Sequence, residues 1–254
     1  MSTPTRTTEK AAPAGARSRR LRRLALPLLL SGGMCLGAVT APAAAGSAHP
    51  GTGIVDSTRH GGKALALTFD DGPHPTETPR LLEVLRRHRV TAVFCLWGDH
   101  VKEHPRIVRA IVAGGHTLCN HTMHHDDMAD WSPEDVRADL TETSAEIRRA
   151  VPGARIPYFR APYGSWGKTP QVAASLGMQP LGWRLAVGDW EPPGTDELVR
   201  RIEEGVTPGA VVLLHDGGGN REQTVEAVDR IIPRLRAEGW HFHHPARHSR
   251  PPHA

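Results

Sequence analysis

Two adjacent aspartates, Asp70 and Asp71, end the first apolar run of the chain, 65–69, and Gly72-Pro73 follows them directly. Large residues at alternate positions of that run predict a buried strand, and Gly-Pro predicts a turn after it. Two carboxylates held side by side at a strand end repel each other. A bound cation removes this electrostatic repulsion, and so does an arrangement in which one carboxylate binds metal and the other accepts protons. Taken alone, the pair is also compatible with ordinary turn chemistry.

Two histidines, His121 and His125, follow a later apolar run at 116–119. On a helical turn, residues four apart point the same way. With one carboxylate they form a two-histidine, one-aspartate set that suits a divalent ion and leaves positions open for water and substrate. Thr122 stands where zinc proteases of the His-Glu-x-x-His type have their glutamate, so that class is excluded. The chain has 16 histidines, which makes this spacing weak evidence by itself.

Three further polar motifs also follow strand-like runs. Arg160 comes after 156–159, Asp189-Trp190 lies in the segment after 179–183, and His215 ends the apolar run 210–214. In a β/α barrel, the residues just past the strand ends converge on one face, where active sites form. Five such motifs in order are hard to explain as turns, and together they predict one catalytic site.

The elements that must position these motifs alternate between strand and helix patterns. Strands are predicted at 64–69, 91–97, 116–119, 156–159, 179–183, 210–214 and 240–242, and helices at 78–89, 105–113, 132–149, 169–176, 195–204 and 222–238. Such alternation favours a parallel sheet. We predict an α/β fold, a distorted or incomplete (β/α) barrel with about seven parallel strands, within a single domain at 63–243.

The segments outside this domain differ in composition. Residues 1–45 hold five arginines at 17–23, an apolar stretch and then Ala-Pro-Ala-Ala-Ala, the order typical of a secretory signal peptide. We therefore predict export, and the alternative is an uncleaved N-terminal anchor. Proline and glycine interrupt the apolar stretch, so no stable membrane span is expected after cleavage. Residues 46–62 are predicted to be a flexible linker and 244–254 a polar tail.

The signal segment carries most of the positive charge. It holds seven of the 31 basic and one of the 27 acidic residues, so residues 46–254 carry 24 basic and 26 acidic ones, a formal net charge of −2. A nucleic-acid partner requires a basic face on the folded domain. No nucleic-acid partner is therefore expected, and we expect a monomer.

Two cysteines, Cys95 and Cys119, remain after the leader, each in an apolar run. If these runs are neighbouring parallel strands, about 4.8 Å apart, a disulfide is within reach. Two buried free thiols are the alternative. An exported protein favours the bridge.

The five motifs together resemble those of the polysaccharide deacetylases, the carbohydrate esterase family 4 or NodB-homology domain. All five have counterparts in order over about 63–243, and the first, Thr-Phe-Asp-Asp-Gly-Pro, stands unaltered at 68–73. The chain departs from the family pattern at Ala186, where the segment before Asp189-Trp190 usually has a first aspartate. Ala161 stands where the family frequently has proline. The departure at Ala186 leaves the support of Asp189 and the choice of substrate open.

The resemblance implies a role for each motif residue. Asp70 would be the general base, paired with Arg160, and His215 the general acid, oriented by Asp189. Asp71, His121 and His125 would hold the metal, zinc first, with Co²⁺, Ni²⁺ or Mn²⁺ as alternatives. The backbone N–H of Tyr163 would stabilise the oxyanion, and Leu213 and Trp190 would wall the acetyl pocket. Beside this set, Trp166 in a Gly-Ser-Trp-Gly loop is a candidate sugar contact.

The expected activity is hydrolytic removal of acetyl groups from an extracellular polysaccharide. N-deacetylation of N-acetylglucosamine units in peptidoglycan or chitin-type chains is our first choice, which makes the chain a hydrolase of carbon–nitrogen bonds other than peptide bonds. An O-acetyl esterase acting on acetylated xylan is the alternative, because the motifs are shared. The rival from another class is a catalytically silent carbohydrate-binding protein on the same fold.

Overall fold

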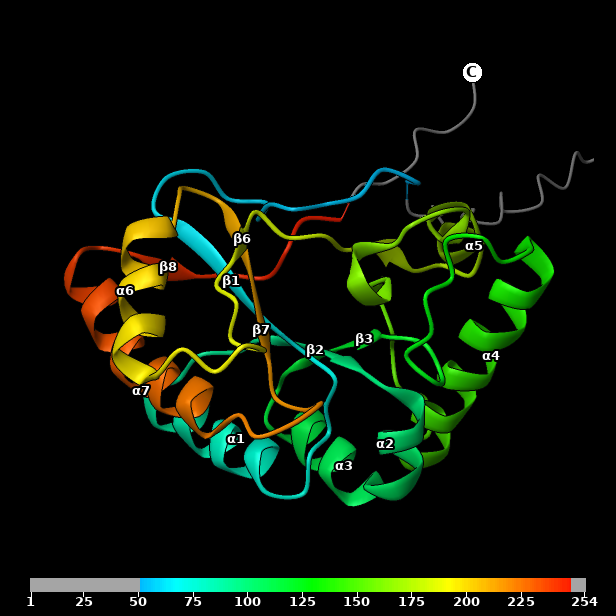
Figure 1. The fold of residues 1–254 in the computed structure, drawn as a ribbon, viewed down its shortest axis with the longest axis horizontal. Coiled ribbons are helices and arrows are strands. Elements are labelled where there is room, and N and C mark those ends of the chain that lie inside the picture. Colours follow the sequence, from blue (N-terminus) through cyan, green and yellow to red (C-terminus); the bar gives the residue numbers. More distant parts are fainter. Residues whose placement is uncertain (1–50, 248–254) are drawn as a thin grey trace, which may run out of the picture. The chain divides into compact units, whose positions relative to one another are not determined.

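Strand β1 (Ala64–Asp70) lies at the centre of a parallel sheet in the computed structural model, which describes residues 51–247 (Figure 1). The sheet order is β5-β4-β3-β2-β1-β7-β6, and β8 pairs with the start of β1. The other strands are β2 (Val93–Leu96), β3 (Thr117–Asn120), β4 (Tyr158–Phe159), β5 (Gln179–Pro180), β6 (Leu185–Ala186), β7 (Ala210–His215) and β8 (His241–Phe242). Every pair of strands in this sheet is parallel.

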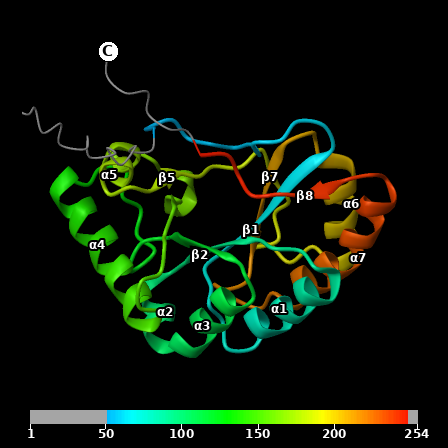
Figure 2. The ribbon, with the colours of Figure 1, turned by 180° about the vertical axis from the view of Figure 1, so that it is seen from behind.

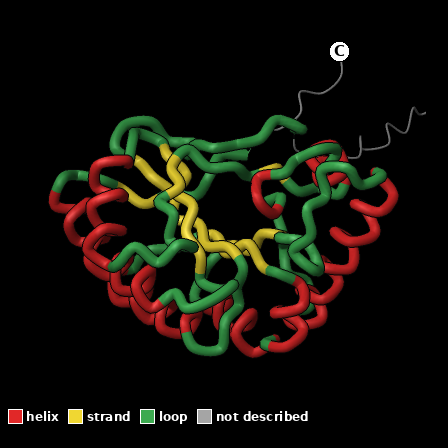
Figure 3. The backbone as a smooth tube through the Cα atoms, in the orientation of Figure 1, coloured by secondary structure: helices red, strands yellow, loops and turns green. Residues whose placement is uncertain are grey.

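The helices cover one face of the sheet, where they follow one another in an arc (Figures 2 and 3). They are α1 (Glu77–His88), α2 (Gly98–Glu103), α3 (Pro105–Ala113), α4 (Pro133–Ala150), the 3₁₀ turn η1 (Pro162–Gly164), α5 (Thr169–Ser175), α6 (Thr195–Gly205) and α7 (Glu222–Ala237). Ser132 caps α4 by accepting the Asp135 N–H at 3.1 Å, and Pro133 occupies its first turn. The incomplete barrel predicted from the sequence is confirmed.

Side chains alternate between the two faces of the sheet because successive strand residues point in opposite directions. Leu65, Leu67 and Phe69 of β1 join the large core under the helices. Ala66 lies with Val93, Cys95, Cys119 and Val211 in a second, smaller cluster on the inner face. Thr68 and Asp70 continue the inner row of β1, and Leu213 and His215 that of β7. The two-residue period of the strands therefore places the side chains of Asp70 and His215 on the same inner face, at the carboxyl ends of β1 and β7.

The two cysteines form the predicted disulfide. Cys95 on β2 and Cys119 on β3 are register partners, their Cα atoms are 4.2 Å apart, and a bond joins the two sulfur atoms. Both are fully buried in the inner cluster. The bridge ties together the two strands that precede α2 and the histidine motif.

The linker predicted at 46–62 is wrong for residues 55–58. Val55 pairs with Leu181 beside β5, Ser57 with Ala210 at the start of β7, and Thr58 with Pro245. Val55 is 3 % exposed, because this segment fills the gap that the short outer strands leave open. The polar tail predicted from 244 is corrected for Pro245, which is buried and accepts a hydrogen bond from the Tyr158 hydroxyl at 2.7 Å.

Three elements were not predicted from the sequence: helix α2, the 3₁₀ turn η1 and strand β6. All three are short, and their residues show no clear apolar period. The predicted signal peptide, the first part of the linker (46–50) and residues 248–254 lie outside the described residues. Within residues 51–247, no helix is both long and apolar enough to cross a membrane.

Candidate active site

Asp70 and Asp71 stand at the rim of the sheet with different surroundings. Asp70 is the last residue of β1, and its register partner on β7 is His215. Asp71 has a left-handed backbone, φ 68°, which turns the chain out of the strand. Gly217 and Gly218 of the loop after β7 lie so close to Asp71 that a Cβ at either position would collide with it. The two loops therefore pack backbone against backbone at this rim.

Two of the predicted metal ligands, His121 and His125, face one carboxylate oxygen of the third, Asp71. Asp71 Oδ1 lies 3.4 Å from His121 Nε2 and 3.2 Å from His125 Nε2. His121 Nδ1 is 2.8 Å from the Arg160 carbonyl oxygen, which only accepts, so Nδ1 carries a proton and, in the neutral ring, Nε2 has the lone pair. His125 Nδ1 lies 3.1 Å from the Tyr163 hydroxyl. These outer partners orient both rings with Nε2 toward Asp71.

The Asp71 carboxylate fits a cation. Its Oδ1 is buried and has no hydrogen-bond partner among the described residues. Burial would raise the pKa of Asp71, but His121 and His125 outweigh it and hold that pKa far below its usual range. An ionised oxygen facing two imidazole Nε2 atoms needs positive charge between them, supplied either by protons on the rings or by a cation held between the oxygen and the two nitrogen lone pairs. Asp71, His121 and His125 also form the one cluster of suitable donor atoms within reach of one another in residues 51–247.

The segment that carries both histidines is a loop, not the helical turn expected from their spacing. Thr122 and His125 have left-handed backbones, with φ 66° and 60°. Such conformations cost on the order of 1 kcal/mol or more per residue and gather at functional sites. Asp71 and Tyr163 (φ 59°) belong to the same group, and the remaining non-glycine case, Arg89, ends helix α1. The strain in the described chain is thus concentrated around the proposed ligands.

Asp70 is held by a fully buried arginine. Arg160 Nη1 donates to Asp70 Oδ1 at 2.6 Å and to Thr68 Oγ1 at 2.9 Å. Its Nε and Nη2 donate to the carbonyl oxygens of Leu181 and Gly182, each at 3.0 Å. The guanidinium is therefore fixed from several sides, and Asp70 Oδ2 is left facing the metal ligands, 3.8 Å from His121 Nε2. This is the partner that the resemblance implied for the base.

His215 and Asp189 form the second charged pair. His215 Nδ1 lies 2.8 Å from Asp189 Oδ1, and the His215 N–H donates to Asp189 Oδ2 at 2.8 Å. The Thr224 hydroxyl also donates to Oδ2, at 2.9 Å. Burial lowers the pKa of His215, but the hydrogen bond and charge of Asp189 outweigh it, so that pKa is raised. The ring therefore favours its protonated form and keeps Nε2 available.

The aromatic and apolar residues of the predicted pocket have different environments. Trp190 is 46 % exposed and its ring meets the His215 ring edge-on, with centroids 5.5 Å apart. Leu213 is buried two residues before His215 on the same face of β7. Trp166 instead packs edge-on against Phe159 and the large core. Trp166 is half-buried, so part of its ring is used in packing, and the sugar contact stays a prediction.

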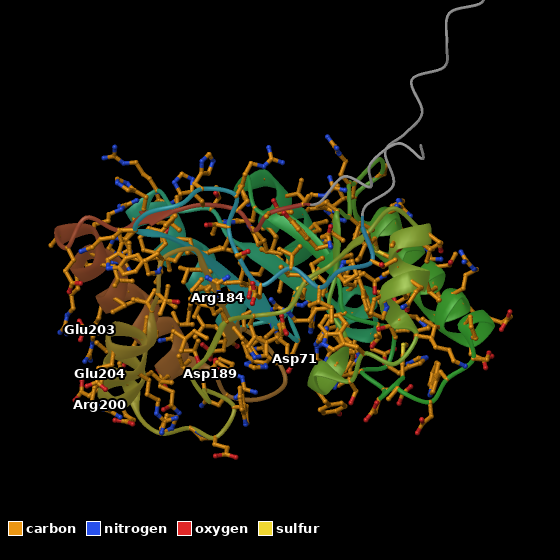
Figure 4. The ribbon with its side chains drawn as sticks, turned by 90° about the horizontal axis from the view of Figure 1, so that it is seen from above. Asp71, Arg184, Asp189, Arg200, Glu203 and Glu204 are labelled. Carbon is orange, nitrogen blue, oxygen red and sulfur yellow. A yellow bond between two sulfur atoms is a disulfide. The ribbon has the colours of Figure 1, made fainter. Side chains whose placement is uncertain are left out.

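The departure at Ala186 leaves Asp189 well held. Ala186 is exposed on β6 and, with Trp190 and Arg201, lines a cavity of about 510 Å³ on the side of α6. Figure 4 shows Asp189 between Asp71 and the α6 side chains Arg200, Glu203 and Glu204, which lie at the outer edge. The contacts from His215 and Thr224 replace any need for a carboxylate at 186 to fix Asp189.

Several site residues carry no motif signal and emerge only from the structure. Asn120 and Asp139 hold the histidine loop, and Thr78 and Asp216 join the loops after β1 and β7. Asp139 lies on the buried stripe of α4 with Val136, Leu140 and Ile147. A charged residue at an apolar position of a helix is a detectable signal, which the motif comparison did not use.

The comparisons with known proteins agree with this geometry. The family model described as polysaccharide deacetylase matches residues 57–181. A chitooligosaccharide deacetylase from Sinorhizobium fredii is 39 % identical over 71 % of this chain and 89 % of its own length. A solved peptidoglycan N-acetylglucosamine deacetylase is 30 % identical, with a TM-score of 0.69 over 74 % of this chain and 88 % of that one.

A third similar protein is a pseudoenzyme of carbohydrate esterase family 4 from Bacillus anthracis. It is 31 % identical, with a TM-score of 0.66 over 71 % of this chain, and this chain spans 63 % of its length. The fold thus occurs both in proteins named as deacetylases and in a protein named as a pseudoenzyme.

Proposed function

The chain belongs to the polysaccharide deacetylase family, and from this premise we propose that it removes N-acetyl groups from N-acetylglucosamine units of a chitin-type or peptidoglycan chain. The relatives named as chitooligosaccharide and peptidoglycan deacetylases support this substrate class. The observation that carries the proposal is the convergence of His121 and His125 on the unpartnered Asp71 oxygen, next to an aspartate held by a buried arginine.

Asp71, His121 and His125 would hold a divalent cation, zinc in first place. Two imidazoles and one carboxylate suit zinc and leave positions free for water and substrate, while Co²⁺, Ni²⁺ and Mn²⁺ accept similar donors. When bound, such a cation polarises the substrate carbonyl and makes a water easier to deprotonate.

Asp70 takes the proton of the attacking water. Arg160 occupies its Oδ1, so Oδ2 is the oxygen available for that transfer. The salt bridge prevents the carboxylate from rotating away, which places the base in a fixed position. Removing this proton while the water attacks the acetyl carbon converts the planar carbonyl into a tetrahedral centre.

The developing oxyanion and the leaving amine have their own partners. The left-handed backbone at Tyr163, φ 59°, presents a peptide N–H at the mouth of the site as a donor to the oxyanion. His215 donates the proton from Nε2 to the leaving nitrogen, because Asp189 already holds Nδ1. Leu213 and the exposed Trp190 flank His215 and would wall the acetyl methyl group.

We also propose that the protein is exported and acts as a monomer. The Cys95–Cys119 disulfide fits an oxidising compartment, in line with the leader-like sequence at 1–45. Every proposed catalytic side chain comes from this one chain, so the site requires no second copy.

The test is acetate release by the purified protein from chitooligosaccharides and, side by side, from acetylated xylan. We expect release from the chitooligosaccharides, its loss after chelation, and its return when Zn²⁺ or another divalent metal is added. Activity on acetylxylan alone would assign the esterase function instead. Binding of chitooligosaccharides without any acetate release at saturating metal would place the chain with silent members of the family.

A further inference from the structure

The loop between the two metal histidines has almost every backbone polar group satisfied by a specific partner. The His121 N–H donates to the Leu96 carbonyl, and the His125 N–H to the Thr122 hydroxyl, each at 3.0 Å. The Thr122 and Met123 carbonyls accept the N–H groups of Gly98 and Asp99 at the start of α2. Such complete pairing is what holds a backbone in an unfavourable conformation.

Two further N–H groups, those of Thr122 and Met123, are bound by side chains that α4 carries or fixes. Asn120 Oδ1 accepts the Thr122 N–H at 3.0 Å, and Asn120 Nδ2 donates to the Leu140 carbonyl and the Ser144 hydroxyl. The Met123 N–H points between both oxygens of Asp139, at 3.0 and 3.2 Å. Met123 is the centre of the loop, two residues from each metal histidine.

The buried carboxylate of Asp139 would destabilise the fold if it served packing alone. It is 6 % exposed, and no basic nitrogen of the described residues lies within ion-pair distance of its carboxylate. Burial raises its pKa to about 6. A buried carboxylate with no cation destabilises a fold unless its hydrogen bonds compensate. The compensation here comes from the Met123 N–H and, more weakly, from the Thr143 hydroxyl at 3.5 Å.

We propose that Asp139 is a positioning residue for the metal centre. By accepting the Met123 N–H, Asp139 clamps the loop and holds His121 and His125 beside Asp71, so that all three can bind one ion. The inference rests on the metal site of the proposed function. The clamp works through the backbone, because Asp139 touches neither histidine. It fixes the left-handed turns at Thr122 and His125, which aim the two rings.

The clamp has a measurable consequence for metal affinity. When Asp139 is shortened to alanine, the Met123 N–H loses its acceptor, the loop relaxes, and the two rings must be reordered each time the ion binds. Loss of a group that orients metal ligands typically weakens metal binding about 10- to 100-fold. Saturating metal should then restore most of the acetate release, because Asp139 takes no part in the proton transfers.

The experiment measures the Zn²⁺ affinity of the full chain by competition with a chromophoric chelator, without substrate. Asp139→Ala should raise the dissociation constant about 10- to 100-fold, and Asp139→Asn by less, because the amide oxygen still accepts one hydrogen bond. The visible spectrum of the Co²⁺-loaded protein should change in Asp139→Ala, since it reports the arrangement of the ligands. A purely structural role would leave this spectrum unchanged.

Glu142→Ala is the matched control. Glu142 is exposed three residues further along α4 and close enough to Asp139 to influence its charge, and among the described residues no hydrogen bond or ion pair joins it to the loop. This variant removes one negative charge from the same helix without removing the clamp. We expect its Zn²⁺ affinity to stay within about twofold of the wild type, as is usual for a distant exposed charge.

Two results would overturn the inference. One is an unchanged Zn²⁺ affinity in Asp139→Ala and Asp139→Asn; the other is an equal loss in Glu142→Ala, which would assign the effect to charge alone. If Asp139→Ala does not fold, Asp139→Asn, which keeps the size of the side chain, decides by the same comparison. A wild type that binds no divalent metal would instead refute the metal site of the proposed function.

Discussion

Asp70 and Asp71 are chain neighbours whose side chains have opposite kinds of partner. Asp70 is bonded to the Arg160 guanidinium, whereas Asp71 Oδ1 faces two imidazole nitrogens. The φ of 68° at Asp71 separates them, because an extended backbone there would send its side chain toward the helices. The backbone conformation at Asp71 thus gives two neighbouring carboxylates different partners.

The variant Asp70→Asn tests the division of roles at this pair. The introduced amide oxygen can still accept the Arg160 hydrogen bond, but the side chain cannot take a proton from water. We expect kcat for acetate release to fall about 10²- to 10⁴-fold, with Zn²⁺ affinity nearly unchanged. Steady-state kinetics and a metal titration measure the two effects. Full hydrolysis by the metal-loaded variant would refute the base assignment.

The variant Asp189→Asn tests the role of His215 as general acid through the pH dependence of kcat. The hydrogen bond and charge of Asp189 outweigh burial and raise the pKa of His215. The amide keeps an acceptor for Nδ1 but lacks the charge, so the pKa of His215 falls. A general acid works only while protonated, and the alkaline limb of the kcat–pH profile should therefore move to lower pH. An unmoved limb would mean that another group limits the rate there.

At the scale of elements, a buried hydrogen-bond chain joins the loop after β1 to the loop after β7. The His74 N–H donates to Thr78 Oγ1 at 2.7 Å, and that hydroxyl donates to Asp216 Oδ2 at 2.5 Å. The Asp216 N–H in turn donates to the Asp70 carbonyl at 3.0 Å. The start of α1 is thereby fastened to the end of β7, which fixes the base relative to the acid.

Thr78→Val and Thr78→Ser form a matched test of this chain. Valine keeps the shape of threonine but leaves the buried His74 N–H and Asp216 Oδ2 without their shared partner, at about 2 to 4 kcal/mol for the two groups. Serine keeps the hydroxyl and loses only a methyl group, at about 1 kcal/mol. Urea unfolding gives both free energies. Equal destabilisation in the two variants would show that packing, rather than the hydroxyl, matters at this position.

The elements predicted well from the sequence were those with a long apolar period. Strand β1 and helix α4 show their period over seven and 18 residues, and α4 also has a serine cap and an N-terminal proline. Strand β6 has two residues and no period to detect. The paired segment 55–58 was missed because its order comes from contacts with distant residues, Leu181, Ala210 and Pro245.

The candidate site was predictable wherever a motif residue itself performs the chemistry. Asp71, His121 and His125 meet as expected, but their loop is not helical, because left-handed backbones at Thr122 and His125 have no sequence signature outside glycine. Asp139 escaped prediction since it acts on a peptide N–H 16 residues away in the chain. A charged residue on the buried stripe of α4 is visible in the sequence, but the backbone group that it contacts leaves no pattern in side-chain types.

At the scale of the whole molecule, the parts of the metal site come from segments that are distant in the sequence. Asp71 follows β1, the histidines follow β3, and Arg160, whose carbonyl orients His121, follows β4. A bound cation would therefore fasten β1 to β3 across the intervening β2. In the unfolded chain these donors are far apart and bind metal weakly, so metal binding and folding are coupled.

This coupling predicts that divalent metal raises the melting temperature. At a free Zn²⁺ concentration of about 100 times the dissociation constant, binding to the native state adds about 2.7 kcal/mol. For a domain of this size each kcal/mol corresponds to about 2–4 °C, so we expect a rise of about 5–10 °C in scanning calorimetry. The rise should shrink as the pH falls, because protonated histidines do not ligate. Asp71→Asn is the control: it removes the oxygen on which both histidines converge, and a full rise in this variant would place the stabilising metal elsewhere.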